Sequence, residues 1–298
     1  MFRCSGVCRL VAISTKGDQM PPERHDREYV LGDSSQEQER LRLQASIVGG
    51  WTEGFFKAAG IDRGMKVLDL GCGLGDVSLL ASEMVGPSGS VTGIDKDPAV
   101  VEKARERCHA QGHSAPIDLV HGDLMDFYSE HRHFDAVVGR YILLYQPDPV
   151  AAIQHVLKSV RSGGIVCFHE MDFANPIRGF PNDTLYAKNF ALVGETFARA
   201  GLRSDFGLHL TTTFMQAGLP WPQLKAEVPI GGEAGSYLYI WLIETLRSLL
   251  PRMESLGVTT AAELDLDTLA ERIEAESTTF HAELFGPLQI GAWSRKVA

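Results

Sequence analysis

Residues 67–76 constrain this chain more than any other part of its sequence. Residues 67–70 are mostly apolar and predict a buried strand, which runs directly into Gly71-x-Gly73-x-Gly75 and then into a helical pattern. Glycine at three alternate positions predicts a tight turn with unusual backbone angles, where a ligand can approach the main chain. A strand, a glycine-rich turn and a helix in this order are typical of a nucleotide-binding unit of a parallel sheet.

Strand and helix patterns alternate downstream of this turn, the rhythm of a parallel sheet covered on both faces by helices. We therefore expect an α/β fold: a Rossmann-like, seven-stranded, mostly parallel sheet with helices on both faces, plus an N-terminal helical cap and a helical lid insertion. Strands are predicted at 66–70, 90–94, 117–121, 134–138, 165–169, 223–228 and 288–295. Core helices are predicted at 76–85, 98–111 and 149–160, with turns at 86–89 and 161–164.

The same patterns predict one domain behind a disordered tail at residues 1–24. Within the domain, residues 25–60 form a cap, 61–175 a cofactor-binding core, 176–286 a lid with the sixth strand, and 287–298 the last strand. The lid holds helical patterns at 184–217, 237–250 and 261–278, rich in Leu, Phe, Tyr and Trp. They predict either a packed helical layer or a lid over an apolar pocket; both can hold at once.

Composition excludes several classes of protein. No run approaches the roughly 18 apolar residues of a membrane helix, and Arg3 and Arg9 interrupt the apolar N-terminal stretch, so we expect neither a membrane span nor a signal peptide. Five scattered cysteines without a C-x-x-C pair indicate reduced thiols and a cytoplasmic location. The net charge of −10 argues against nucleic-acid or anionic-membrane partners.

Carboxylates follow the first three predicted strands in positions that suit a nucleoside. Asp95 ends the second strand, where a Rossmann unit places an acceptor for ribose hydroxyls, and Lys96 beside it is a further cofactor candidate. Asp123 after the third strand suits an adenine amino group, with Leu124 against the ring, and Asp69 suits a ligand ammonium. Each carboxylate alone could merely cap a helix or end a strand, but together they predict a cofactor site.

The spacing separates two possible cofactors. A dinucleotide turn reads G-x-G-x-x-G, whereas the third glycine here falls one residue early and Asp76 follows it. A pyrophosphate also requires a helix N-terminus free of competing anions, and Asp76 would lie there. S-adenosylmethionine (SAM) carries no phosphate, and its sulfonium and ammonium groups tolerate carboxylates. The pattern therefore favours SAM over NAD.

These residues resemble the class I SAM-dependent methyltransferases, in particular the ubiquinone/menaquinone-biosynthesis type and its natural-product relatives. The resemblance covers about residues 29–175, and the ending Gly291-Ala-Trp-Ser-Arg-Lys296 is similar to last strands in that group. It implies a cap that closes over SAM, with Tyr29 and Gln44 near the methionine end. It implies nucleoside contacts from Gly71, Gly73, Asp95, Asp123 and Leu124, with Arg140 after the fourth strand. The long helical segment before the last strand departs from the minimal fold and leaves the substrate open.

The carboxyl ends of the fourth and fifth strands would carry the chemistry, because ligands of open α/β sheets bind there. Glu170 is the candidate general base, with the alternative that it caps a loop or pairs with Arg178. His169 is the next catalytic candidate, although a packed histidine is common at such a strand end. Tyr141, Tyr145, Phe173 and Arg178 are substrate-binding candidates, and the two tyrosines could instead pack under the lid.

The sequence thus predicts methyl transfer from SAM to a small, rather apolar metabolite at O, N or C. One alternative is C-methylation of an isoprenoid alkene with Glu170 as the base; a divalent metal would be needed only if that substrate were a diphosphate. A rival of another class is a SAM-binding protein without transfer activity, and the acidic balance counts against a macromolecular substrate. No metal site is expected otherwise, and homo-oligomers are possible through leftover apolar surface.

Overall fold

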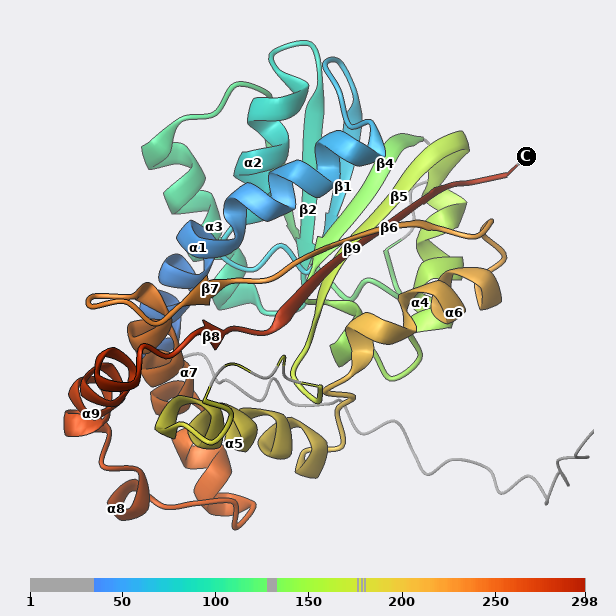
Figure 1. The fold of residues 1–298 in the computed structure, drawn as a ribbon. Coiled ribbons are helices and arrows are strands. Elements are labelled where there is room, and N and C mark those ends of the chain that lie inside the picture. The colour runs from blue at the N-terminus through green and yellow to red at the C-terminus, as the bar shows by residue number, and fades with distance from the viewer. Residues whose placement is uncertain (1–34, 128–132, 176, 178, 180, 298) are drawn as a thin grey trace, which may run out of the picture.

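The computed structural model describes residues 35–127, 133–175, 177, 179 and 181–297, with side chains from Ile47 onward. Its centre is a seven-stranded sheet in the order β3-β2-β1-β4-β5-β9-β6 (Figure 1). Strands β1 to β5 pair in parallel, whereas β9 runs antiparallel to both of its neighbours. The predicted fold class is confirmed. The strands are β1 Lys66–Leu70, β2 Ser90–Asp95, β3 Ile117–His121, β4 Phe134–Arg140, β5 Val160–Asp172, β6 Gln223–Glu227 and β9 Leu288–Arg295.

Helices cover both faces of this sheet, because its central strands are apolar on both sides. On one face, alternate residues such as Val67, Val138 and Cys167 pack against the first two helices; on the other, Leu68, Val137 and the residues in register with them join the main core. The first face carries α1 Ser35–Ala59, α2 Asp76–Val85 and α3 Pro98–Gln111, and the second carries α4 Pro149–Val156 and α6 Leu210–Gln216, with the short helices η1 Leu143–Tyr145, η2 Leu157–Ser159 and η3 Phe206–His209.

A separate helical layer lies at one end of the sheet, in the lower left of Figure 1. Helix α7 packs against α5, α9 and α1, so the layer connects the segment after β5 with the N-terminal helix. A two-stranded sheet that the sequence did not predict, β7 with β8, lies beside it because it joins residues about fifty positions apart. The elements are α5 Leu185–Arg199, β7 Ile230–Gly231, α7 Tyr237–Ser255, α8 Ala261–Leu264, α9 Leu266–Phe280 and β8 Leu284–Phe285.

Strand β5 is longer than the sequence predicted. We expected a helix to residue 160, a turn at 161–164 and a strand only at 165–169, whereas α4 ends at Val156 and β5 runs through Val160–Asp172. Residues 161–164, predicted as a turn, belong to the strand because they pair with residues near the C-terminus. The Gly163 N–H donates to the Lys296 carbonyl at 2.8 Å, and the Lys296 N–H donates to the Gly164 carbonyl at 2.9 Å. This partner lies more than a hundred residues away, so local propensity could not reveal it.

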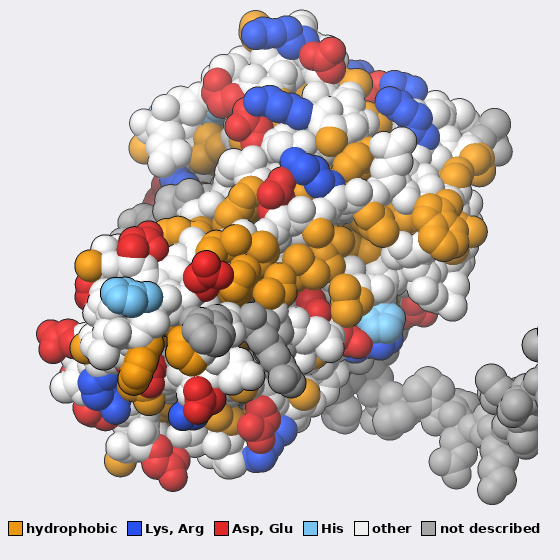
Figure 2. Space-filling view, in the orientation of Figure 1, with side chains coloured by type: hydrophobic (Ala, Val, Ile, Leu, Met, Phe, Trp, Pro, Cys, Tyr) orange, Lys and Arg blue, Asp and Glu red, His pale blue; other side chains and the backbone are white. Residues whose placement is uncertain are grey.

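Strand β6 is the outer edge of the sheet and leaves apolar side chains in solvent. Trp221 just before it is 72% exposed and Leu224 within it is 50% exposed. Figure 2 shows apolar side chains gathered across the middle of this face, over β6 and β7. Such surface would suit a homo-oligomer, which stays a prediction. None of the helices described here is long and apolar enough to cross a membrane.

The contact of α1 with the sheet yields a test of the fold. Gly291 on β9 lies under the ring of Phe55, and an added Cβ would come within 2.7 Å of three ring carbons. Gly291→Ala should therefore lower the free energy of unfolding by about 1–3 kcal/mol through overpacking, measured by urea unfolding.

Gly49→Ala is the matched control, because an added Cβ at Gly49 in α1 meets no atom within 4 Å. It should raise the free energy of unfolding by about 0.5–1 kcal/mol, the usual gain of alanine over glycine in a helix. Equal effects of the two substitutions would show that Phe55 does not hold α1 on β9.

Candidate functional site

The glycine-rich turn between β1 and α2 is built as the sequence predicts. Gly71, Gly73 and Gly75 have φ of 62°, 51° and 85°, a left-handed conformation that favours glycine. An added Cβ at Gly71 would collide with Ile142, and one at Gly75 would lie 3.1 Å from the Cys108 sulfur. At Gly73 it would meet no atom within 4 Å. The turn therefore packs tightly at both ends and is open at its centre, where a ligand can reach the backbone.

Asp95 holds this turn against the end of β2. Its Oδ2 accepts a hydrogen bond from the Gly73 N–H at 2.9 Å, and its Oδ1 accepts one from the Asp97 N–H at 3.1 Å. The side chain is only half-buried, so both oxygens keep lone pairs for further donors. Lys96 beside it is exposed. The structure thus brings Asp95 to the open centre of the turn, where a ribose would need it.

Asp69 lies beneath the same turn and is completely buried. The Ser78 hydroxyl donates to its Oδ2 at 2.6 Å, but its Oδ1 has no partner among the described residues. Burial raises the pKa of this carboxyl to about 7, against the opposing effects of Ser78 and Arg140. A buried carboxylate oxygen without a donor suits a cationic ligand group such as the SAM ammonium.

Asp123 and Leu124 have separate environments after β3. Asp123 is exposed, and its Oδ1 accepts a hydrogen bond from the Met125 N–H at 2.7 Å, which leaves Oδ2 for a ligand. Leu124 is buried at the margin of the main core, with 9% of its surface exposed. Both lie at the same sheet edge as Asp95, so the geometry allows the predicted adenine contacts.

The N-terminus of α2 carries the acidic residue that argued against a dinucleotide. The Arg107 guanidinium donates to Asp76 Oδ1 at 2.6 Å and to the Leu74 carbonyl at 3.1 Å. This pair fixes the glycine turn from the side of α3 and keeps a carboxylate where a pyrophosphate would bind. The residues present therefore fit SAM better than NAD.

Two neighbouring strand ends meet beside this turn. Tyr141 follows β4 with φ of 56°, which is rare for a residue that is not glycine. Its N–H donates to the His169 carbonyl at 2.9 Å, and its hydroxyl donates to Gln289 Oε1 at 2.5 Å. Arg140 lies over the Tyr141 ring, with its guanidinium carbon 5.9 Å from the ring centre. Tyr141 is thus held on three sides at the carboxyl edge of the sheet.

His169 is a packed, neutral histidine within a hydrogen-bond chain. The Gln289 amide nitrogen donates to the Pro287 carbonyl, so its Oε1 accepts from His169 Nε2 at 2.9 Å. The proton therefore lies on Nε2, and Nδ1 accepts from the Thr52 hydroxyl at 3.0 Å. Burial, aided by the Arg140 charge, lowers the pKa of His169 to about 3. This geometry favours the structural alternative for His169 over a catalytic role.

Glu170 is fully buried on the opposite face of β5 and binds the loop after β4. Its Oε1 accepts from the Ile142 N–H at 3.0 Å and the Leu143 N–H at 2.7 Å, at the start of η1. Its Oε2 has no partner among the described residues. Burial raises the pKa of Glu170 to about 8, as its apolar surroundings predicted. One oxygen therefore caps a loop, and the other is free to hold a proton.

The remaining candidates fall into two groups. Tyr145 and Phe173 each lie near the Phe197 ring, with centroids 6.5 Å and 5.1 Å away, at the side of the lid helices. Tyr29 and Arg178 lie outside the described residues, and so does the side chain of Gln44.

Three residues of this region had no signal in the sequence. They are Thr52, Ser78 and Gln289, uncharged residues that belong to no motif in the sequence. Each forms a hydrogen bond with a predicted site residue. Register could have drawn attention to Gln289, since it is a buried polar residue opposite Met171 in the antiparallel pair of β5 and β9.

Comparison with known proteins finds a family model that matches the part of the chain that holds this site. Residues 61–201 match the model of the methyltransferase domain family, a span that contains the glycine turn, Asp95, Asp123 and Glu170. This span of the chain is therefore similar to a methyltransferase domain. The resemblance seen in the sequence is thereby confirmed for this part of the chain, and the family implies SAM as the methyl donor.

Relatives of the methyltransferase domain agree with this assignment. A demethylmenaquinone methyltransferase of Staphylococcus aureus is 31% identical over 155 residues, 52% of this chain and 61% of the relative, so the chain spans about three-fifths of that relative's length. The structure of protein BH2331 of Bacillus halodurans has a TM-score of 0.54 at 16% identity, covering 83% of this chain and 99% of that one. The cyclase SpnF has a TM-score of 0.50 at 20% identity, covering 83% and 80%.

Asp69 makes the stability of the ligand-free chain depend on pH. Its pKa rises from 3.8 to about 7 on folding, so between these values the folded chain binds more protons than the unfolded chain. The wild-type chain therefore loses stability as pH rises through this window, whereas Asp69→Asn cannot ionise. We expect the gain in stability of Asp69→Asn over wild type to grow from about pH 4 to about pH 7 and to level off above.

Urea unfolding at a series of pH values measures this difference. Asp267→Asn, which removes an exposed carboxylate in α9, is the control and should show no such growth. A constant difference between Asp69→Asn and wild type would contradict the burial of an unpaired carboxyl at this position.

Proposed function

We propose that this chain transfers a methyl group from SAM to a small, apolar molecule. The observation that carries the proposal is the open centre of the glycine turn at Gly73, with the unpartnered Oδ1 of Asp69 below it and the Asp95 carboxylate beside it. An ammonium donor and ribose hydroxyls would complete these groups, and SAM carries both. Asp123 and Leu124 would receive the adenine at the next strand end.

Further contacts with SAM belong to the same proposal. Arg140 lies near Asp69 and His169, and its charge affects the pKa of both, so it would face the methionine end. Gly71 and Gly75 shape the turn itself, and Lys96 would remain at its exposed margin. Tyr29 and Gln44 keep the role that the resemblance implies, that of a cap over the methionine end.

Bound SAM would supply a methyl group already activated by its sulfonium. The chain then has to align the acceptor with that methyl and, for acceptors that carry a hydrogen, remove a proton. In its ionised form, Oε2 of Glu170 can take that proton, because it has no donor among the described residues and a pKa of about 8 makes the carboxylate a stronger base than an ordinary one. Oε1 meanwhile keeps the loop after β4 in place.

Three features favour an apolar acceptor. Tyr145 and Phe173 gather with Phe197 beside the strand ends that carry Tyr141 and Glu170. One relative is named for the transfer of a methyl group to demethylmenaquinone. The net charge of −10 disfavours polyanionic substrates.

An isoprenoid alkene remains the alternative acceptor, since aromatic rings stabilise a passing carbocation. Its diphosphate form would need a divalent metal, and among the described residues no group of three or more His, Cys, Asp or Glu could hold one. The proposal therefore includes no metal.

A second candidate function is SAM binding without methyl transfer. It is favoured by one observation: the fold is shared with SpnF, which is named a cyclase, and a fold alone does not determine a reaction. Calorimetric titration with SAM and S-adenosylhomocysteine, with NAD as control, tests the cofactor. A screen with methyl-tritiated SAM and phenols, quinols and isoprenoids then separates the two functions, because only the methyltransferase would label an acceptor.

Asp95→Ala tests the ribose contact. We expect SAM binding to weaken by about 1–3 kcal/mol, because charge-assisted hydrogen bonds are lost. The neighbouring Asp97→Ala is a matched control: Asp97 caps α3 through the Ala99 and Val100 N–H groups, so it should lower stability and spare SAM affinity. An unchanged dissociation constant in Asp95→Ala would refute the site.

Glu170→Gln separates the two oxygens of Glu170. The amide oxygen can still accept from Ile142 and Leu143, but the variant cannot take up a proton. We expect turnover of the acceptor found in the screen to fall about 100-fold or more, while S-adenosylhomocysteine affinity stays constant. Glu170→Ala serves as the comparison, because it removes both the acceptor for the Ile142 and Leu143 N–H groups and the group that takes up the proton. Full activity in Glu170→Gln would assign Glu170 to positioning alone.

A further inference from the structure

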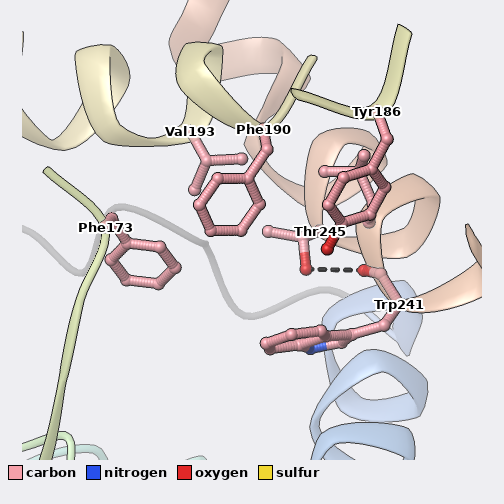
Figure 3. Close-up of a pocket in the computed structure, with 7 residues that line it drawn as sticks. Phe173, Tyr186, Phe190, Val193, Trp241 and Thr245 are labelled. Carbon is pink, nitrogen blue, oxygen red and sulfur yellow. Dashed lines mark hydrogen bonds between the residues drawn. The ribbon is translucent and has the colours of Figure 1, made fainter. Parts of the chain in front are cut away.

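A small apolar cavity lies between the segment after β5 and the lid helices α5 and α7. Its walls are Phe173 from that segment, Tyr186, Phe190 and Val193 from α5, and Trp241, Leu242 and Thr245 from α7 (Figure 3). Four of these seven side chains are aromatic and none is charged. Phe173 is a substrate-binding residue predicted from the sequence, whereas Tyr186 has no role in that prediction.

The walls pack closely against neighbouring segments. The Phe173 N–H donates to the Ser204 carbonyl at 2.7 Å, and an added Cβ at Gly194 would lie 2.8 Å from the Phe173 carbonyl oxygen, so α5 lies directly on this segment. Trp241 packs against Gly286, where an added Cβ would lie 2.8 Å from the indole. Tyr186 and Phe190 stack with ring centroids 5.9 Å apart and an interplanar angle of 16°.

Two hydrogen-bond donors of this cavity are unsatisfied. Tyr186 Oη and Trp241 Nε1 have no partner among the described residues, although their side chains are only 3% and 4% exposed. Figure 3 shows the Tyr186 hydroxyl directed from α5 toward α7, beside Thr245. Burial raises the pKa of Tyr186 well above its usual range, so the phenol keeps its proton. A buried donor without an acceptor is costly, which indicates that something else supplies the acceptor.

The cavity adjoins the proposed reaction site. Phe173 is three residues beyond Glu170 along the chain, and its ring lies 5.1 Å from that of Phe197, which also neighbours Tyr145. The volume is about 10 Å³, room for roughly one water molecule. A larger ligand therefore requires α5 and α7 to separate, as a lid does.

We propose that this cavity is the binding site for an uncharged, ring-shaped ligand that carries a carbonyl or ether oxygen, with Tyr186 as the residue that selects for that oxygen. The inference rests on the proposed function and names the substrate class of that site. A carbonyl or ether oxygen accepts a hydrogen bond and brings no hydrogen of its own, which matches the unpaired Tyr186 hydroxyl in this cavity. The aromatic walls match a ring, and the lack of charged groups excludes an ion, whose desolvation nothing here would offset.

The test uses two probes with the same carbon skeleton, 1-tetralone with a carbonyl and tetralin without one. Their binding to the full chain saturated with S-adenosylhomocysteine is measured by ligand-observed NMR. An unspecific apolar cavity would favour tetralin, the more hydrophobic probe, whereas the proposal expects tetralone to bind several-fold more tightly. Tyr186→Phe should weaken tetralone binding roughly 5-fold and leave tetralin binding constant.

Two further variants locate the effect. Tyr239→Phe is the control, because the Tyr239 hydroxyl donates to the Gly232 carbonyl at 2.7 Å, outside the cavity; it should not change the preference between probes. Val193→Phe fills the cavity and should abolish binding of both. Absence of probe binding, a preference for tetralin, or an unchanged preference in Tyr186→Phe would overturn the proposal.

Thermal unfolding of the ligand-free chain distinguishes a ligand site from a buried water. If Tyr186 Oη lacks a partner, Tyr186→Phe should raise the melting temperature; if an ordered water satisfies it, the variant should lower it, and this result would overturn the proposal. The two proposals can fail independently. If the chain binds S-adenosylhomocysteine but no probe, only this inference is refuted. If the chain does not bind S-adenosylhomocysteine, the proposed function is refuted.

Discussion

The buried carboxylate of Glu170 is the constraint on which the candidate site depends. It accepts two backbone hydrogen bonds from the loop after β4, and that loop places Ile142 against Gly71. The glycine turn is in turn bonded to Asp95 at the end of β2. Four strand ends, those of β5, β4, β1 and β2, are thus connected through the carboxyl groups of Glu170 and Asp95 and the backbone N–H groups that they accept from. Since these groups are buried or half-buried, each bond is protected from competing water.

A second set of contacts attaches the N-terminal helix to the same edge. Thr52 of α1 donates to His169, His169 donates to Gln289 of the last strand, and Tyr141 donates to the same oxygen of Gln289. The neutral histidine is therefore a connector with a defined tautomer. Residues from α1, β5 and β9 meet in this network, so these elements are held in one arrangement around Arg140 and Tyr141.

Buried polar groups without partners mark where a ligand would complete the protein. Asp69 Oδ1 lies beneath the glycine turn, Glu170 Oε2 lies beside the loop after β4, and Tyr186 Oη lies in the lid cavity. Native proteins satisfy most buried polar atoms, and under the proposed function a ligand would supply the partners of these three. In the proposed function they correspond to the cation of the donor, the proton of the acceptor and the oxygen of the acceptor.

The sequence by itself determined the sheet, the glycine turn and the carboxylates at the strand ends. Alternation of apolar strands with helices has a local period, and glycine at fixed spacing reflects a local backbone requirement, so both can be read along the chain. The tertiary structure decided what long-range contacts control. The extension of β5 by Lys296, the bonding of His169 to Thr52 and Gln289, and the meeting of Phe173, Tyr186 and Trp241 each join segments far apart in the sequence. Such pairings depend on which surfaces are buried together, and no local pattern records them.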